Sequence, residues 1–103
     1  MPKKFHLDIE PEAFDDIQEA IDYYNSKQDG LGKRFFEMVD EHFEFLKKDY
    51  MTFAVRYDDI RCMPIEKFPY LIHYRVLKSQ GVVSFKAVFC TYDNPDKWEK
   101  RSH

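Results

Sequence analysis

The residues of this sequence that are best suited to chemistry are cations, an imidazole and a phenol in its C-terminal half. They are Arg56, Arg61, Lys67, His73, Arg75, Lys86 and Tyr92. Such a set contains the parts of a small RNA-cleaving site, because a cation stabilises charge that develops on phosphorus and a Tyr or His moves the proton of a ribose hydroxyl. Cations on a sheet also serve as ordinary surface or ion-pairing groups, so both roles stay open.

Two runs of β-branched and aromatic residues carry most of this set. Residues 67–76 and 82–91 alternate their side chains with period two, which predicts a pair of strands in one sheet. In the first strand the two faces hold Tyr70, Ile72, Tyr74 and Val76 on one side and Leu71, His73 and Arg75 on the other. The second face is therefore either a working surface or a solvated back.

The N-terminal half predicts one strand followed by two helices. Residues 5–9 alternate as a short strand, and Pro11 suits the first turn of a helix. The apolar stripe of this helix consists of Phe14, Ile17, Ala20, Ile21 and Tyr24. After a turn at residues 25–30, a second helix is marked by Leu31, Phe35, Met38, Val39, His42 and Leu46. Phe36 and Phe43 fall off that stripe, which indicates either a wide core contact or a partner.

The order of elements predicts the fold class. Residues 53–58 and 60–65 are expected to add strands before the central pair. We therefore expect one domain over residues 1–103, of the α+β class, with a small and mostly antiparallel sheet of four or five strands. The N-terminal helical hairpin should pack on one face of this sheet. A helical turn from Pro95 and a docked Trp98 are expected to close the chain.

Composition excludes several classes of function. The net charge of -3 divides into 7 Lys and Arg against 13 Asp and Glu in residues 1–50, and 9 against 6 in residues 51–103. This balance argues against a general or sequence-specific DNA binder acting alone, although a basic face on the sheet remains possible. Cys62, Cys90 and four isolated His give no metal-ligand spacing, and no Gly-rich phosphate loop occurs. No metal or cofactor is expected.

The chain lacks an apolar run of membrane-spanning length, and its first residues lack the apolar stretch of a secretion signal. We therefore expect a cytoplasmic protein with no membrane partner.

Several stretches resemble the RelE/ParE toxin family of bacterial type II toxin–antitoxin modules, whose members are also known as plasmid-stabilisation proteins. The stretches are residues 20–25 (AIDYYN), residues 31–35 (LGKRF), Arg61, residues 67–76 (KFPYLIHYRV), residues 87–89 (AVF), Asn94, Pro95, Trp98 and Arg101. Together they span roughly residues 5–101, and their order is more specific than any single one. The resemblance implies a small sheet with two N-terminal helices.

The resemblance also implies a function and a choice between targets. In the ribosome-dependent RNases of this family, an arginine on the middle strands acts with a basic group and a tyrosine near the end of the last strand. Arg61 and Tyr92 match two of these elements, which makes them the candidate catalytic residues of an mRNA endoribonuclease. Asp93 stands where those relatives often carry a cation, so the sequence is nearer the ParE-like branch, whose members poison DNA gyrase. A non-toxic protein-binding relative is the third reading.

A toxin of this kind implies a small cognate antitoxin as its partner. An antitoxin helix or strand is expected in the groove between the helical hairpin and the sheet. The residues expected to contact the antitoxin or the target are Arg56, Lys67, His73, Arg75, Phe36, Phe43, Lys97 and Arg101.

Overall fold

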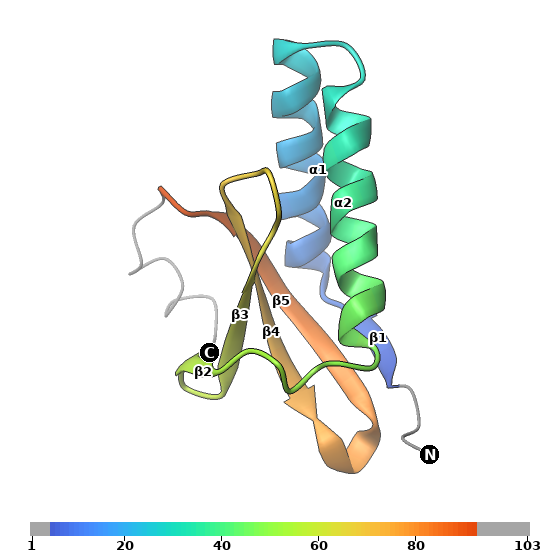
Figure 1. Cartoon of the computed structure of the whole chain (residues 1–103), viewed down its shortest axis with the longest axis vertical. Helices are drawn as coiled ribbons and strands as arrows, with labels where there is room; N and C mark the ends of the chain where they lie inside the picture. The colour runs from blue at the N-terminus through green and yellow to red at the C-terminus, as the bar shows by residue number, and fades with distance from the viewer. Residues whose placement is uncertain (1–4, 93–103) are drawn as a thin grey trace.

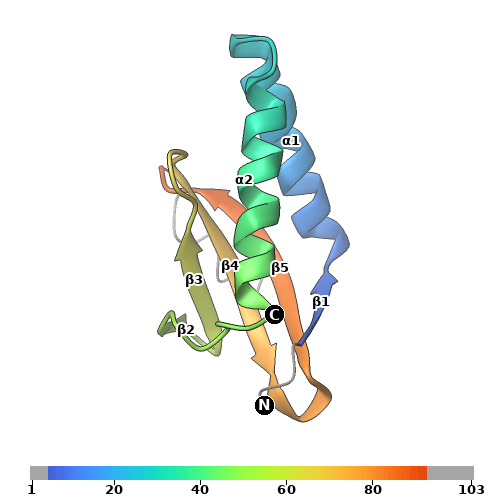
Figure 2. The ribbon, with the colours of Figure 1, turned by 45° about the vertical axis from the view of Figure 1, so that its right-hand side comes forward.

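A five-stranded sheet with two helices on one face makes up the computed structural model, which describes residues 5–92 (Figures 1 and 2). The elements in chain order are β1 (His6–Ile9), α1 (Pro11–Lys27), α2 (Leu31–Leu46), β2 (Val55–Tyr57), β3 (Ile60–Pro64), β4 (Tyr70–Leu77), a short 3-10 turn (Lys78–Gln80) and β5 (Val82–Cys90). The strand order is β1-β5-β4-β3-β2. The pair β1 and β5 is parallel, and the three other pairs are antiparallel. The α+β expectation is confirmed; the expected closing helix with Trp98 lies outside the described residues.

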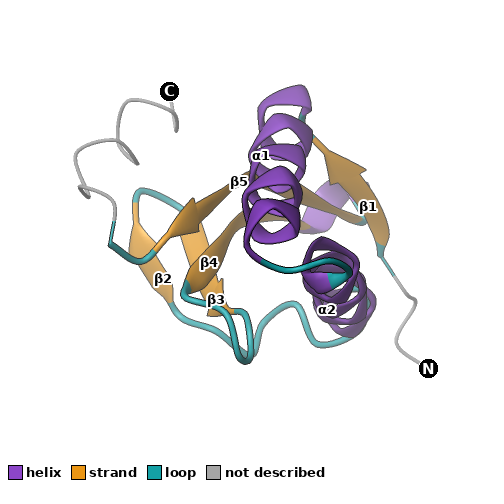
Figure 3. Ribbon diagram, turned by 90° about the horizontal axis from the view of Figure 1, so that it is seen from above, coloured by secondary structure: helices purple, strands orange, loops and turns teal. Residues whose placement is uncertain are grey.

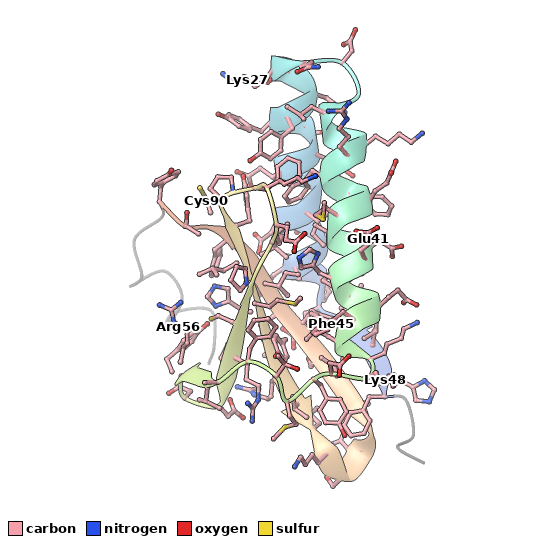
Figure 4. All side chains as sticks on the ribbon, viewed as in Figure 1. Lys27, Glu41, Phe45, Lys48, Arg56 and Cys90 are labelled. Carbon is pink, nitrogen blue, oxygen red and sulfur yellow. The ribbon has the colours of Figure 1, made fainter. Side chains whose placement is uncertain are left out.

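The two helices form an antiparallel hairpin whose tip extends past the sheet, where Lys27 marks it in Figure 4. Pro11 and Glu12 occupy the first turn of α1, where a missing N–H and a carboxylate are both favourable. The hairpin turn ends at Gly30, which has a φ of 84°. Gly32 lets the helices approach closely, because a Cβ there would lie 2.5 Å from the Ile21 carbonyl oxygen. The Gly32 N–H donates to the Asn25 side chain at 2.9 Å.

The stripe of α1 differs from the expected one at its first position. Ala13, Ile17 and Ala20 are buried, whereas Phe14 is 55% exposed. Phe14 therefore presents its ring to solvent, and the smaller Ala13 faces the sheet in its place.

The face of α2 that packs on the sheet is wider than one stripe. Phe35, Val39, His42 and Leu46 are buried as expected. Phe43 is also buried, and its ring stacks on Phe85 of β5 with centroids 4.1 Å apart. The wide core contact is therefore the role of Phe43, which is 5% exposed and not available to a partner. Phe36 remains 52% exposed.

Both faces of the central strands are buried. Ile72 and Tyr74 lie in the core under the helices, as the alternation predicts. The other face buries Leu71 and His73 as well, at 7% and 0% exposure. The centre of this second face is thus neither an open working surface nor a solvated back.

The β2 edge is shorter than the sequence indicates, because the strand expected over residues 53–58 covers only Val55–Tyr57. The Phe53 carbonyl oxygen accepts a hydrogen bond from the Arg61 guanidinium at 2.6 Å. A side chain therefore takes the acceptor that a longer strand would have given to its neighbour.

Candidate functional site

Arg61 lies on the helix-facing side of β3, next to the buried Met63. Its Nη1 donates to the Phe53 carbonyl at 2.6 Å, and its backbone pairs with Tyr74 of β4. It also lines a hollow of about 240 Å³ with Met51, Val55, Asp59, Val76 and Lys78. The hydrogen bond from Arg61 therefore holds the segment before β2 in place, and the Arg61 side chain also borders one small hollow.

Arg75 is on the opposite face of the sheet from Arg61. The residues paired in register are Arg61 with Tyr74 and Ile60 with Arg75, and side chains of successive strand residues point to opposite faces. The Arg75 Nε is bonded to the Asp59 carboxylate at 2.7 Å. The candidate catalytic residue Arg61 and the candidate binding residue Arg75 therefore lie on opposite faces of the sheet.

His73 is an internal group. Its Nδ1 lies 2.9 Å from the Tyr57 hydroxyl and 3.4 Å from the Cys62 Sγ, and the whole side chain is 0% exposed. Burial raises the pKa of the Cys62 thiol to about 11, while Arg56 opposes this rise. The cluster consequently contains a neutral thiol, which is a poor nucleophile, and a His73 ring that solvent and partners do not reach.

Tyr92 is placed far from Arg61 by the strand register. Arg61 pairs with Tyr74, and Tyr74 pairs with Phe85, seven residues before Tyr92. Cys90, the last residue of β5, is five residues past Phe85, about 17 Å along the sheet at about 3.3 Å per residue, and Tyr92 follows it in a turn. Tyr92 is 86% exposed just past β5. The structure therefore does not bring the two candidate catalytic residues together.

The remaining candidates are scattered. Arg56 lies on β2 at the sheet edge (Figure 4), and Lys67 is exposed in the loop between β3 and β4 with a φ of 70°. Lys86 bonds the Glu10 carboxylate at 2.6 Å. Lys97 and Arg101 lie outside the described residues.

A groove lies between α2 and the sheet, and we call it the α2 groove. It consists of two adjoining hollows that share Glu41. The upper hollow, of about 420 Å³, is lined by Leu31, Arg34, Glu37, Met38, Glu41, Lys67 and Phe68. The lower hollow, of about 330 Å³, is lined by Glu41, His42, Phe45, Phe53, Met63 and Glu66. One wall is therefore α2, and the other is formed by β3, the loop after it, and Phe53.

The fold produces this groove because the helices cover only part of the sheet. Figure 3 shows α1 crossing β5 and α2 standing beside it, with β3 and β2 further out. The sequence signal for the groove is a second helical stripe, at Leu31, Arg34, Met38, Glu41 and Phe45, that recurs every three or four residues beside the core stripe. A groove was expected between the hairpin and the sheet, but this stripe does not stand out in the sequence, because it mixes charged and apolar residues.

His42 joins the two walls. Its Nδ1 lies 2.7 Å from the Met38 carbonyl oxygen, and its Nε2 lies 3.3 Å from the Glu66 backbone nitrogen. A carbonyl only accepts and a backbone N–H only donates, so both bonds are made by the neutral ring with its proton on Nδ1. This bridge holds the loop after β3 against α2 and sets the width of the groove.

Another hollow lies between α1 and the end of β5. It has a volume of about 170 Å³ and is lined by residues that include Asp16, Glu19, Tyr23, Tyr70 and Cys90. Asp16 is engaged there, because its carboxylate accepts from the Val88 N–H at 3.0 Å. One of the polar groups that line this hollow is therefore already used in a hydrogen bond between α1 and β5.

Metal-binding groups of three or more His, Cys, Asp or Glu do not occur within residues 5–92. None of the helices in that part of the chain is both long enough and apolar enough to cross a membrane. What the geometry does offer is a groove suited to a polypeptide segment, with an apolar floor and charged rims.

The comparisons with known proteins agree with this description. The chain resembles a solved structure described as the chromosomal ParDE toxin–antitoxin system from P. aeruginosa, with a TM-score of 0.73 and 15% identity, over 84% of this chain and 96% of that one. This likeness shows the fold. No curated protein matches the chain. The family model of the ParE toxin of type II toxin–antitoxin systems, parDE, matches residues 7–95. The chain therefore belongs to the ParE toxin family of type II toxin–antitoxin systems.

Proposed function

We propose that the protein is a toxin subunit that a small cognate antitoxin neutralises by laying a segment in the α2 groove. The observation that carries this proposal is the groove itself, whose walls come from the helical hairpin and from the sheet. Phe45 is 39% exposed at its lower end, and Met38 and Phe68 are partly buried in its upper part. Exposed apolar side chains at the bottom of a groove are typical of a surface that receives a helix.

We further propose that the cellular target is DNA gyrase. The ParE-like character of the sequence supports this target, and the geometry supports it over RNA cleavage. Arg61 is bonded to Phe53, and the register separates it from Tyr92, so neither is placed to act on the same phosphate. A toxin that inhibits an enzyme by binding to it needs no such pair of catalytic groups.

Inducible expression in a bacterial host tests toxicity and neutralisation together. Growth should stop when the chain is expressed alone and should continue when the small protein encoded beside it is expressed too. Unchanged growth, with the chain confirmed as soluble, would contradict the proposal. In a separate assay, the purified protein should inhibit DNA supercoiling by gyrase and leave the activity of topoisomerase I unchanged. New mRNA ends that depend on translation, with gyrase unaffected, would instead assign RNA cleavage.

Two phenylalanines on α2 locate the antitoxin surface. Phe45→Arg places a cation in the groove, whereas the matched Phe36→Arg alters a residue that is also exposed but lies outside the groove lining. We expect Phe45→Arg to remain toxic and to escape the antitoxin, and Phe36→Arg to remain toxic and neutralised. Escape by Phe36→Arg alone would move the antitoxin to the other side of the helix.

A further inference from the structure

The rims of the α2 groove carry five exposed charged side chains in an ordered arrangement. At the upper end Arg34 of α2 and Lys67 of the facing loop line the same hollow. Below them Glu41 and Glu66 line the lower hollow, and Glu37 lies between the two ends. Both cations therefore line the upper hollow, together with Glu37 and Glu41, whereas the charged side chains of the lower hollow are all acidic.

These charges are available to a partner. None of the five rim charges takes part in an ion pair within residues 5–92, where the ion pairs include Lys47 with Glu44, Arg75 with Asp59, and Lys86 with Glu10. All five are exposed, so each keeps its hydration until something covers the groove. A partner that covered them without opposite charges would leave them desolvated and unpaired, at a considerable cost in affinity.

The spacing of the two ends is fixed by the helix. Arg34 and Glu41 are seven residues apart on α2, which is about 10 Å at 1.5 Å per residue. Leu31 and Phe45 limit the groove, and fourteen residues of helix span about 21 Å. A second helix lying along α2 repeats its side chains with the same rise, so its positions i and i+7 meet the two ends together.

We propose that the α2 groove selects an amphipathic helix with an acidic and a basic residue seven positions apart, on the same flank of an apolar stripe. The acid pairs with Arg34 and Lys67, the base pairs with Glu41 and Glu66, and the stripe covers Met38 and Phe68. This inference rests on the proposed function only in naming the antitoxin as the natural source of that helix. The charge order itself is a property of the groove.

A peptide library tests the charge order without requiring the antitoxin. The probe is a displayed set of 16-residue helical peptides with a fixed leucine stripe, in which the flanking positions vary among Glu, Lys and Gln. Selection on the intact protein should enrich peptides with one Glu and one Lys seven positions apart. Selection on the Arg34→Glu/Lys67→Glu variant should enrich Lys at both positions, because both ends of that groove are acidic.

A matched control separates the groove from general electrostatics. Lys33 and Lys48 are also exposed cations, and both lie outside the groove lining. Lys33→Glu/Lys48→Glu changes the net charge by the same amount as Arg34→Glu/Lys67→Glu and should enrich the same peptides as the unchanged protein. An enriched peptide should bind the Arg34→Glu/Lys67→Glu variant about tenfold more weakly and the control variant equally well.

The proposal would be overturned by enrichment without a charge preference, by the same enriched peptides on Arg34→Glu/Lys67→Glu, or by no enrichment on the folded protein. None of these results depends on growth arrest, so failure of the toxin assignment stays a separate outcome. Circular dichroism on each variant checks that the fold is kept, which the exposure of all substituted side chains favours.

Discussion

The Asp16 carboxylate of α1 accepts a hydrogen bond from the backbone N–H of Val88 in β5, at 3.0 Å. The bond is needed because β1 pairs with β5 only from Val82 to Phe85, so the rest of that edge of β5 has no neighbouring strand within residues 5–92. A side chain from a helix thus satisfies a donor that a longer β1 would have paired, and it fixes α1 over the end of the sheet.

Asp16→Ala should lower the free energy of unfolding by about 1.5–3 kcal/mol, because a bond to a charged acceptor is lost and a partly buried N–H remains. Asp16→Asn should lower the free energy of unfolding by less, since its amide oxygen still accepts the hydrogen bond from the Val88 N–H. Urea unfolding measures both variants. Asp15→Ala, at an exposed neighbouring position, is the control and should change stability little. Equal losses for Asp15→Ala and Asp16→Ala would contradict the role of the bond.

Gly32→Ala should destabilise the helical hairpin. The added Cβ would lie 2.5 Å from the Ile21 carbonyl oxygen and 2.6 Å from the Asn25 side chain, so the helices must separate. Overpacking of this kind costs about 1–3 kcal/mol, which thermal unfolding resolves. Gly30→Ala is the comparison, since its Cβ meets nothing within 4 Å and only the φ of 84° opposes it. A Gly32→Ala protein as stable as the parent would contradict the close helix contact.

Arg61→Ala combined with Tyr92→Phe should leave the toxin active against its target. About 17 Å of β5 separates the level of Arg61 from the end of the strand that Tyr92 follows, so the two residues do not share a catalytic step. Arg61→Ala removes the bond to Phe53 and should lower the melting temperature, whereas Tyr92→Phe changes an exposed side chain and should not. Growth arrest at equal soluble expression is the measurement. Loss of growth arrest with Tyr92→Phe alone would favour RNA cleavage over gyrase inhibition as the activity of the toxin.

Stability should fall as the pH rises from about 9 to 12. Burial raises the pKa of Cys62 from 9.0 to about 11 and the pKa of Tyr74 from 10.0 to about 12. The unfolded chain therefore loses these protons at lower pH than the folded protein does, and ionisation favours unfolding. Each group contributes a slope of at most about 1.4 kcal/mol per pH unit.

Urea unfolding at several pH values measures this slope. Cys62→Ala should flatten the curve between pH 9 and 11, and Tyr74→Phe should flatten it between pH 10 and 12. Tyr74→Phe also removes the hydroxyl that donates to the Tyr50 carbonyl at 3.1 Å, so the variant should be less stable at neutral pH as well. A stability that is independent of pH above 9 would contradict the burial of both groups.

The periodicity of the sequence was sufficient for most of the fold. Two hydrophobic repeats, of about 3.6 and of 2 residues, gave the helices of α1 and α2 and the pairing of β4 with β5, because local geometry dictates which side chains share a face. The same rule placed Ile72 and Tyr74 in the core and His73 on the other face. The family followed from the order of these stretches along the chain.

The candidate site could not be obtained in the same way. Arg61, Arg75, His73 and Tyr92 form a plausible set as a list of residue types, but register and strand alternation place them on two faces and at two ends of the sheet. Whether a polar residue is buried depends on what packs over it, and His73 is enclosed next to Tyr57 and Cys62, residues 16 and 11 positions away along the chain.

By itself, the sequence determined the elements, the faces of the central strands and the family, since each depends on the spacing of nearby residues. Only the tertiary structure decided that α2 stands beside β3 and leaves the α2 groove open, and that Arg34 and Lys67 share one end of it. The reason is that a groove is made by residues distant in the chain, and its shape follows from how the hairpin packs on the sheet.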